Sequence, residues 1–457
     1  MFRKKSLLVV FVAGVTVGLL FGSVAARPGD SDWNAWKSKF FGPLSLAVRQ
    51  VQMRYVEEVD PEKLLVGAYH GILSQLDDYS SYIPRKRLEE FQGDTQGEFG
   101  GLGIQIRFDP MQKVLRVEQP IPGTPAFQKG VLAGDIITRI HDKPTDKFYD
   151  TSEFESVHDA VRILRGEVGT EVTITVFHKK SREQEEITIE RATISVPGVR
   201  SAKIVDKEWK IGYVYVANFH ERTAKDLRKS IKKLQKQGMR AIVVDLRFNP
   251  GGLLTSAIDV SDMFLSDATV VSTRGRQSPE QVYRTHSKDL LVDAPVAILV
   301  NGYSASASEI VAGAIKDNKR GLIVGDTTFG KGSVQSILPL GKEQGALKLT
   351  TAKYYTPSGT CIEKMGVRPH LEISLTDEQT RELAQKIAAE EGYPPVRDKD
   401  EEKKETNSPF VPSSEETEKD EDKEPFRDNQ LIGAIDALKA VLVERQLVPT
   451  QTTTSAK

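Results

Sequence analysis

Residues 296–310 read VAILVNGYSASASEI, an apolar run followed by a turn of small residues and the start of a helix. The apolar run is typical of a short strand that is covered on both faces. The serines then reach a helix amino terminus, where free N–H groups and the helix dipole favour negative charge. A nucleophilic oxygen and its oxyanion intermediate need that environment. Because serine is also a common helix cap, the stretch alone leaves both interpretations open.

The same texture extends on both sides of this stretch. From about residue 202 to 375, apolar runs such as Ala241–Leu246 alternate with helical stretches, which predicts an α/β core. The run at 241–246 leads into Asn249-Pro-Gly-Gly252. This tight turn either ends a strand and does nothing more, or exposes a glycine amide that can donate to an oxyanion.

Residues 325–335 read GDTTFGKGSVQ and include a lysine between two glycines. A phosphate-binding loop is excluded, because Gly332 follows Lys331 where a hydroxyl is needed and the next residues resemble a strand. Gly330 and Gly332 allow the backbone to approach another element closely. A desolvated Lys331 has a lowered pKa and can take a proton from a serine, with Gln335 to orient it. A solvated surface lysine is the alternative.

Composition changes mark the predicted domain boundaries. Short β-type runs with glycine turns and one amphipathic helix fill residues 97–194, a compact β-rich module, and a helical segment at 27–96 precedes it. The α/β core occupies 195–375. Residues 376–427 are expected to be a charged, disordered linker, because the acidic, basic and proline-rich run from 394 onward cannot bury enough apolar surface. A short docking helix is predicted at 428–448.

The amino terminus predicts export. Residues 1–26 combine MFRKK with an uncharged apolar run, which fits a signal peptide or a signal anchor, and both stay open. The rest of the chain is expected outside the cytoplasm, in the periplasm or an equivalent compartment. A formal net charge of −1 in 457 residues gives no reason to expect nucleic acid as a partner.

Other candidate residues are weaker. Cys361 is the single cysteine, so no intrachain disulfide forms, and no motif marks it as a nucleophile. None of the seven histidines lies in a site motif; His220, which follows a strand, is the strongest alternative base. No Cys/His pairing or His-Glu-x-x-His spacing indicates a metal, and no metal or cofactor is expected.

In combination, SASASE, FGKG and NPGG resemble the carboxy-terminal processing (tail-specific) serine proteases, over roughly residues 51–375. The resemblance implies that Ser306 is the nucleophile, Lys331 the general base and Gln335 a supporting residue. It places the oxyanion hole at Gly251, Gly252 and Ala307. Residues 354–359, YYTPSG, resemble a further segment of the family, but Thr360-Cys361 differs from the residues that usually follow it.

The resemblance also identifies the β-rich module as a PDZ domain inserted beside a crotonase-like ββα protease core with helical terminal segments. Its carboxylate-binding loop falls on Gly101, Leu102, Gly103 and Ile104, so polypeptide tails are the implied substrates. A homodimer or higher oligomer and an activating adaptor are further partners that the family implies. Arg165 is either a coupling residue or a plain surface arginine, and Asp317 is expected to be structural.

Two rival functions remain at this stage. A non-catalytic PDZ scaffold with a degenerate core would not need to keep Ser306, Lys331 and Gln335 together. An acyl-CoA enzyme on a related α/β core would have no use for the PDZ-like module. The sequence therefore favours a serine endopeptidase that processes or degrades exported proteins.

Overall fold

The protein is described by a computed structural model that covers residues 30–179, 181–277, 279–286, 290–341, 344–390 and 426–447. The chain divides into two compact units, Met1–Leu76 and Asp77–Lys457, and each is described by itself. The predicted signal segment 1–26 lies outside the described residues. In the described part, no helix is both long enough and apolar enough to cross a bilayer.

The described part of the first unit, residues 30–76, contains two helices, α1 (Asp30–Arg54) and α2 (Pro61–Leu73). Asp60 caps α2 by accepting a hydrogen bond from the Glu62 amide, and Pro61 occupies the first turn, as the sequence predicts. The predicted helical segment 27–96 also contains β1 (Ser81–Ile83) and α3 (Arg85–Gln96) in the second unit. The expectation of helix alone was wrong at β1, which pairs with a strand of the core.

A six-stranded sheet forms the centre of the α/β core, in the order β10-β11-β12-β15-β16-β19. The pair β10–β11 is antiparallel, and the other neighbours are parallel. The strands are β10 (Val199–Asp206), β11 (Ile211–Val216), β12 (Ala241–Asp245), β15 (Val296–Val300), β16 (Leu322–Gly325) and β19 (Leu371–Glu372).

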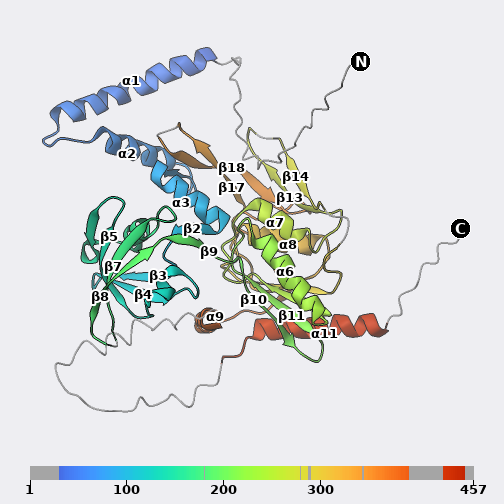
Figure 1. The fold of residues 1–457 in the computed structure, drawn as a ribbon. Coiled ribbons are helices and arrows are strands. Elements are labelled where there is room, and N and C mark those ends of the chain that lie inside the picture. Colours follow the sequence, from blue (N-terminus) through green and yellow to red (C-terminus); the bar gives the residue numbers. More distant parts are fainter. Residues whose placement is uncertain are drawn as a thin grey trace, which may run out of the picture. The chain divides into compact units, whose positions relative to one another are not determined.

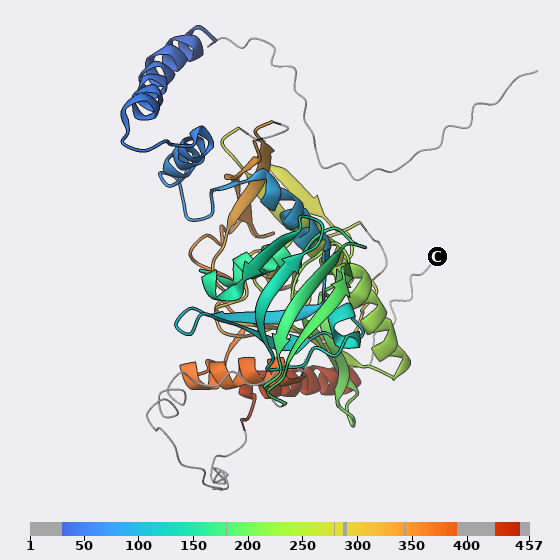
Figure 2. The same ribbon diagram turned by 60° about the vertical axis from the view of Figure 1, so that its left-hand side comes forward.

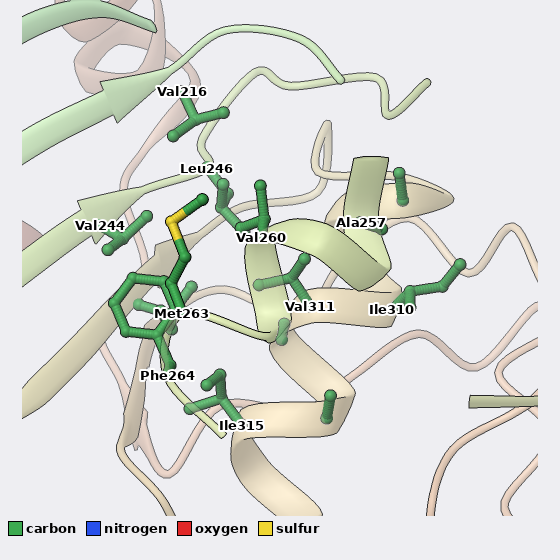
Figure 3. Packing of buried hydrophobic residues seen from close by; sticks show 14 of the residues in the cluster. Val216, Val244, Leu246, Ala257, Val260, Met263, Phe264, Ile310, Val311 and Ile315 are labelled. Carbon is green, nitrogen blue, oxygen red and sulfur yellow. The ribbon is translucent and has the colours of Figure 1, made fainter. Parts of the chain in front are cut away.

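Both faces of this sheet are covered at its central strands β11, β12, β15 and β16, which explains why these four strands are almost entirely apolar. On one face, α6 (Thr223–Lys236), α7 (Leu254–Ser261) and α8 (Ala307–Asp317) pack over alternate strand residues (Figure 1). Figure 3 shows Val216 of β11, Val244 of β12 and Leu246 just after β12 in one cluster with side chains of α7 and α8. The intervening strand residues face Ala434, Leu438 and Leu442 of α11 (Asn429–Leu447). The predicted buried strands are confirmed.

A second sheet lies beside the core, in the order β1-β18-β13-β14 with β17 also paired to β18. Its remaining strands are β13 (Thr269–Arg274), β14 (Gln281–Arg284), β17 (Ser333–Pro339) and β18 (Ala346–Tyr355). Strand β17 directly follows the lysine of the GKG motif, so the strand predicted after Lys331 is confirmed.

The β-rich module is a separate six-stranded sheet with its own core. Its order is β3-β4-β5-β7-β8, with β6 on β5. Strands β2 and β9 pair with each other, so the chain enters and leaves the module side by side, as expected of an insertion. The elements are β2 (Glu98–Gly101), β3 (Ile104–Asp109), β4 (Val114–Pro120), α4 (Pro125–Gln128), β5 (Ile136–Asp142), β6 (Lys147–Asp150), η1 (Thr151–Glu153), α5 (Val157–Leu164), β7 (Glu171–Phe177), β8 (Gln184–Glu190) and β9 (Ala192–Ser195).

The carboxy-terminal part corrects one boundary. Residues 377–390, predicted to lie in the disordered linker 376–427, form α9 (Asp377–Glu390), because Leu383 and Ile387 give this stretch apolar residues to pack. Residues 391–425 of the predicted linker lie outside the described part. The predicted terminal helix is present as α11, and Figure 2 shows it beside α9.

Candidate active site

Ser306 lies at the sharp turn between β15 and α8. Its φ of 54° is a conformation that few non-glycine residues adopt, and such strain is common at functional turns. The flanking Ser304 and Ser308 are fully buried, and their hydroxyls donate to the carbonyls of Leu246 and Asn249 at 2.8 and 2.9 Å. Ser306 is only partly buried, so its side chain is the one of the three that a substrate can reach.

The glycine loop that follows β12 packs directly on the serine turn. The Asn249 side chain holds it, because Nδ2 donates to the Val216 carbonyl at 2.7 Å and Oδ1 accepts from the Gly251 amide at 2.8 Å. Gly251 has a φ of 102°. A Cβ there would lie 2.6 Å from the Ala305 carbonyl oxygen and 2.8 Å from the Ser306 Cβ, so only glycine fits.

Two backbone amides at this junction are available to a ligand. Within the described residues, neither the Gly252 amide nor the Ala307 amide donates to a protein acceptor. The Gly251 amide, in contrast, is engaged by Asn249. Ala307 is also the first residue of α8, where the helix dipole favours an anion.

The lysine loop joins β16 to β17 and approaches residues 362–366 closely. A Cβ on Gly332 would lie 2.4 Å from the Glu363 backbone nitrogen, so the close approach requires glycine. Lys331 is partly buried, and its Nζ lies 4.9 Å from the centroid of the Tyr79 ring. Burial lowers the pKa of Lys331, and the positive charge of Lys348 lowers it further.

Glu309 joins the serine turn to the lysine loop. Its buried carboxylate accepts the Ser306 and Lys331 amides on Oε2 at 2.8 and 2.9 Å. On Oε1 it accepts the Thr328 hydroxyl and the Gly330 amide at 2.6 and 2.7 Å. The backbone nitrogens of Ser306 and Lys331 both lie within hydrogen-bond distance of Glu309 Oε2. These two nitrogens can therefore be no farther apart than the sum of their distances to that oxygen. Burial raises the pKa of Glu309, and the four donors oppose that rise.

Comparisons with known proteins agree on one family. Residues 210–373 match peptidase family S41, and residues 116–176 match the PDZ domain. A carboxy-terminal-processing protease of Bartonella bacilliformis is 40% identical over 379 residues, which cover 81% of this chain and 82% of the relative. The carboxy-terminal processing protease CtpA of Bacillus subtilis is 31% identical over 81% of this chain and 75% of the relative.

The chain belongs to peptidase family S41. It is a serine-type peptidase with a PDZ domain, as the sequence predicts, and not an acyl-CoA enzyme. Among solved structures, a photosystem II D1 C-terminal processing protease is similar at 27% identity and a TM-score of 0.44. That match covers 75% of this S41 peptidase and 92% of the solved chain.

Gln335, expected to support the lysine of this S41 peptidase, has other partners. Its Nε2 donates to the Ser333 hydroxyl at 2.9 Å and to the Thr350 hydroxyl at 3.2 Å. Thr350 in turn donates to Asp77 Oδ1 at 3.1 Å. No hydrogen bond between Gln335 and Lys331 occurs among the described residues, so Gln335 fixes β17 to β18 here.

The predicted carboxylate-binding loop leads into β3, which lies at the edge of the PDZ sheet. Leu102 is buried, and Gly103 has a φ of +75° with its carbonyl accepting from the Thr124 hydroxyl at 3.0 Å. Gly101 ends β2, and Ile104 begins β3. A groove between β3 and the start of α5 is lined by Ile106, Arg107, Phe108, Pro110, Glu118, Glu155, Ser156 and Val157.

Among the weaker candidates, His220, Asp317 and Arg165 make contacts of their own. The ring of His220 packs against Gly97. Asp317 accepts a backbone N–H from the loop after β18, at 2.9 Å, which fits a structural role. The guanidinium of Arg165 lies 3.9 Å from the centroid of the Phe99 ring. Cys361 is a partly buried free thiol. Among the described residues, no three His, Cys, Asp or Glu side chains are placed to hold a metal ion.

Sequence reasoning assigned no role to Glu309. The available signal was its position three residues after Ser306 at a helix start, which is the spacing of a capping box. That pattern predicts the bond from Glu309 to the Ser306 amide. The bonds to the lysine loop join residues that are 19 to 22 positions apart, and no local pattern encodes such contacts.

Proposed function

We propose that this peptidase cleaves polypeptides with Ser306 as nucleophile and Lys331 as general base. The observation that carries the proposal is the Glu309 carboxylate, which binds the backbone amides of both residues through one oxygen atom. The lowered pKa of Lys331 supports it, because a neutral amine can accept the serine proton.

The proposed reaction begins when Lys331 Nζ takes the proton of Ser306 Oγ as that oxygen attacks the peptide carbonyl carbon. The Gly252 and Ala307 amides donate to the oxyanion, and Gly251 supports them by its close packing rather than by donating. The protonated Lys331 then gives its proton to the leaving amine. The Lys331 side chain, again neutral, then activates a water molecule that hydrolyses the ester on Ser306. Gln335 holds the strand that follows the base.

Substitution of the two residues tests this mechanism. With casein as substrate, Ser306→Ala and Lys331→Ala are each expected to lower kcat by about a thousand-fold or more, by comparison with serine protease knockouts. The matched controls are Ser358→Ala and Lys229→Ala, both at exposed positions, and they should cleave at the parental rate. Parental activity in Ser306→Ala or Lys331→Ala would refute the dyad. Absence of cleavage by the parent from neutral to alkaline pH would favour the non-catalytic scaffold.

We further propose that the PDZ domain selects carboxy-terminal or unfolded segments. The edge strand β3 can accept an added strand, and the loop at residues 101–104 can offer amides to a terminal carboxylate. Two reporter peptides with one sequence, one ending in a free carboxylate and one in an amide, separate this idea from simple length preference. The free acid should have the lower KM, and equal KM values would contradict the proposal.

The cellular setting is also a proposal. Export follows from residues 1–26, whose removal or retention amino-terminal sequencing of the exported protein would decide. A homodimer or higher oligomer is supported by exposed aromatic side chains on α1, including Trp36, Phe40 and Phe41, and light scattering tests it. We also propose, from the family resemblance, that an activating adaptor binds this peptidase. The same resemblance supports a crotonase-like ββα arrangement of the core.

A further inference from the structure

A buried ion cluster lies directly behind the glycine loop. Arg247, two residues before Asn249, is almost fully buried. Its Nε and Nη2 donate to Asp245 at 3.0 and 2.6 Å, and its Nη1 and Nη2 donate to the two oxygens of Asp428, each at 2.9 Å. A charge at this depth is tolerated only when it is paired and hydrogen-bonded. The position of Arg247 therefore depends on both carboxylates.

One of those carboxylates comes from the far end of the chain. Asp428 is 181 residues away from Arg247 in sequence and stands just before α11. Burial acts to raise the pKa of Asp428, but the Arg247 guanidinium holds it below its usual range. The segment is held independently by Ala434 and Leu438, which are buried against the central sheet. Loss of the Asp428 charge should therefore leave α11 docked.

Gln430 extends the same cluster to the lysine loop. Its Oε1 accepts from Arg247 Nη1 at 3.1 Å, while its Nε2 donates to Asp326 Oδ2 at 2.9 Å and to the Ile373 carbonyl at 2.7 Å. Asp326 directly follows β16 and opens the loop that carries Lys331. One fully buried side chain thus contacts the residue at the base of each catalytic loop.

We propose that Asp428 and Gln430 are positioning residues that hold the glycine loop and the lysine loop in register for catalysis. The segment that carries Asp428 and Gln430 then supports the two catalytic loops, although it contributes no group to the reaction. This inference rests on the proposed roles of Gly252 and Lys331. It predicts that disturbing the cluster impairs the chemical step more than substrate binding, because neither residue lies among the groups proposed to contact substrate.

Substitutions of Asp428 and Gln430 should lower activity for different reasons. In Asp428→Asn, an amide N–H₂ opposes one of the Arg247 donors, so one of the two bonds is lost and the glycine loop shifts. We expect kcat to fall about 10- to 100-fold at every pH, the cost typical of a misplaced catalytic group, with KM within about twofold of the parent. Gln430→Glu keeps the acceptor for Arg247 but turns a like charge toward Asp326. Its kcat should also fall, and the pH at which activity rises should move.

The experiment uses the full chain, a casein-derived peptide substrate and three measurements: kcat and KM across pH, the folded fraction by circular dichroism, and thermal unfolding. Asp436→Asn is the matched control, because Asp436 is on α11 with 66% of its side chain exposed. It should behave as the parent. The parent and Ser306→Ala are run first, so that failure of the proposed chemistry is seen separately.

Folded Asp428→Asn and Gln430→Glu chains with parental kcat would overturn the inference. A loss of kcat that merely matches a smaller folded fraction would also overturn it, since that result means fewer folded sites and not misplaced loops. Should Asp428→Asn fail to fold, Gln430→Glu decides the question alone, because it keeps the bond to Arg247 and alters only the contacts with Asp326 and the Ile373 carbonyl.

Discussion

Glu309→Gln is the most informative single change at the contact between the serine turn and the lysine loop. The carboxylate accepts four hydrogen bonds, two on each oxygen. A glutamine has one acceptor oxygen, so whichever way its amide is turned, two donors lose their acceptor and face an N–H₂ group. The affected pair is either Ser306 with Lys331 or Thr328 with Gly330.

The expected cost follows from those contacts. Two hydrogen bonds to a charged acceptor contribute about 3 to 6 kcal/mol together. Part of this loss is offset, because burial raises the pKa of Glu309 and a neutral side chain avoids that burial penalty. We therefore expect the free energy of unfolding to fall by about 3 kcal/mol. The displaced serine turn and lysine loop should lower kcat by about 100-fold.

Urea unfolding measures the first quantity and steady-state hydrolysis of a peptide reporter measures the second. Glu208→Gln, at an exposed position, is the control and should change neither. The reasoning is refuted if Glu309→Gln unfolds within about 0.5 kcal/mol of the parent, the range of an ordinary surface substitution, and keeps its kcat.

Three further outcomes are expected. Because Lys331 acts as a base only when deprotonated, kcat should rise with pH through the pKa of Lys331. Lys348→Met removes a neighbouring positive charge and so raises the pKa of Lys331. The rise in kcat should then occur at higher pH. Glu363→Gln removes a negative charge and should move it to lower pH, and a shift of both variants in one direction would contradict this account. Gly251→Ala should abolish turnover while KM changes little, since its Cβ would lie 2.6 Å from a carbonyl oxygen of the serine turn; normal kcat would show that the loop is not packed there. Gly103→Val should raise KM for tailed substrates, measured by reporter hydrolysis, because its φ is +75° and its Cβ would meet Thr124 at 2.2 Å; unchanged KM would exclude a role for this loop.

The sequence predicted the parts of the fold that local pattern encodes. Apolar runs such as Val296–Val300 are strands covered on both faces, and the Asp60-Pro61 pair starts α2. Glycines mark the close approaches at Gly251 and Gly332. In each case the residue type at that position responds to its immediate surroundings, so the pattern is visible without the fold.

The parts that sequence missed depend on contacts between distant segments. Strand β1 exists because Tyr82 and its neighbours pair with β18, more than 260 residues later. One partner of Arg247, Asp428, lies 181 residues later in the chain, so no local pattern predicts this pair. Gln335 was assigned to Lys331 by resemblance, but its side-chain amide bonds to Ser333 and Thr350.

The proposed mechanism requires Lys331 to be uncharged beside Ser306 at the pH of catalysis. Nuclear magnetic resonance of a lysine-labelled Ser306→Ala chain, with Lys331→Arg to assign the signal, measures that pKa directly. We predict a pKa for Lys331 clearly below the roughly 10.4 of an exposed lysine. A value at or above that of an exposed lysine would contradict it, because the amine would then carry its proton when the serine has to lose one.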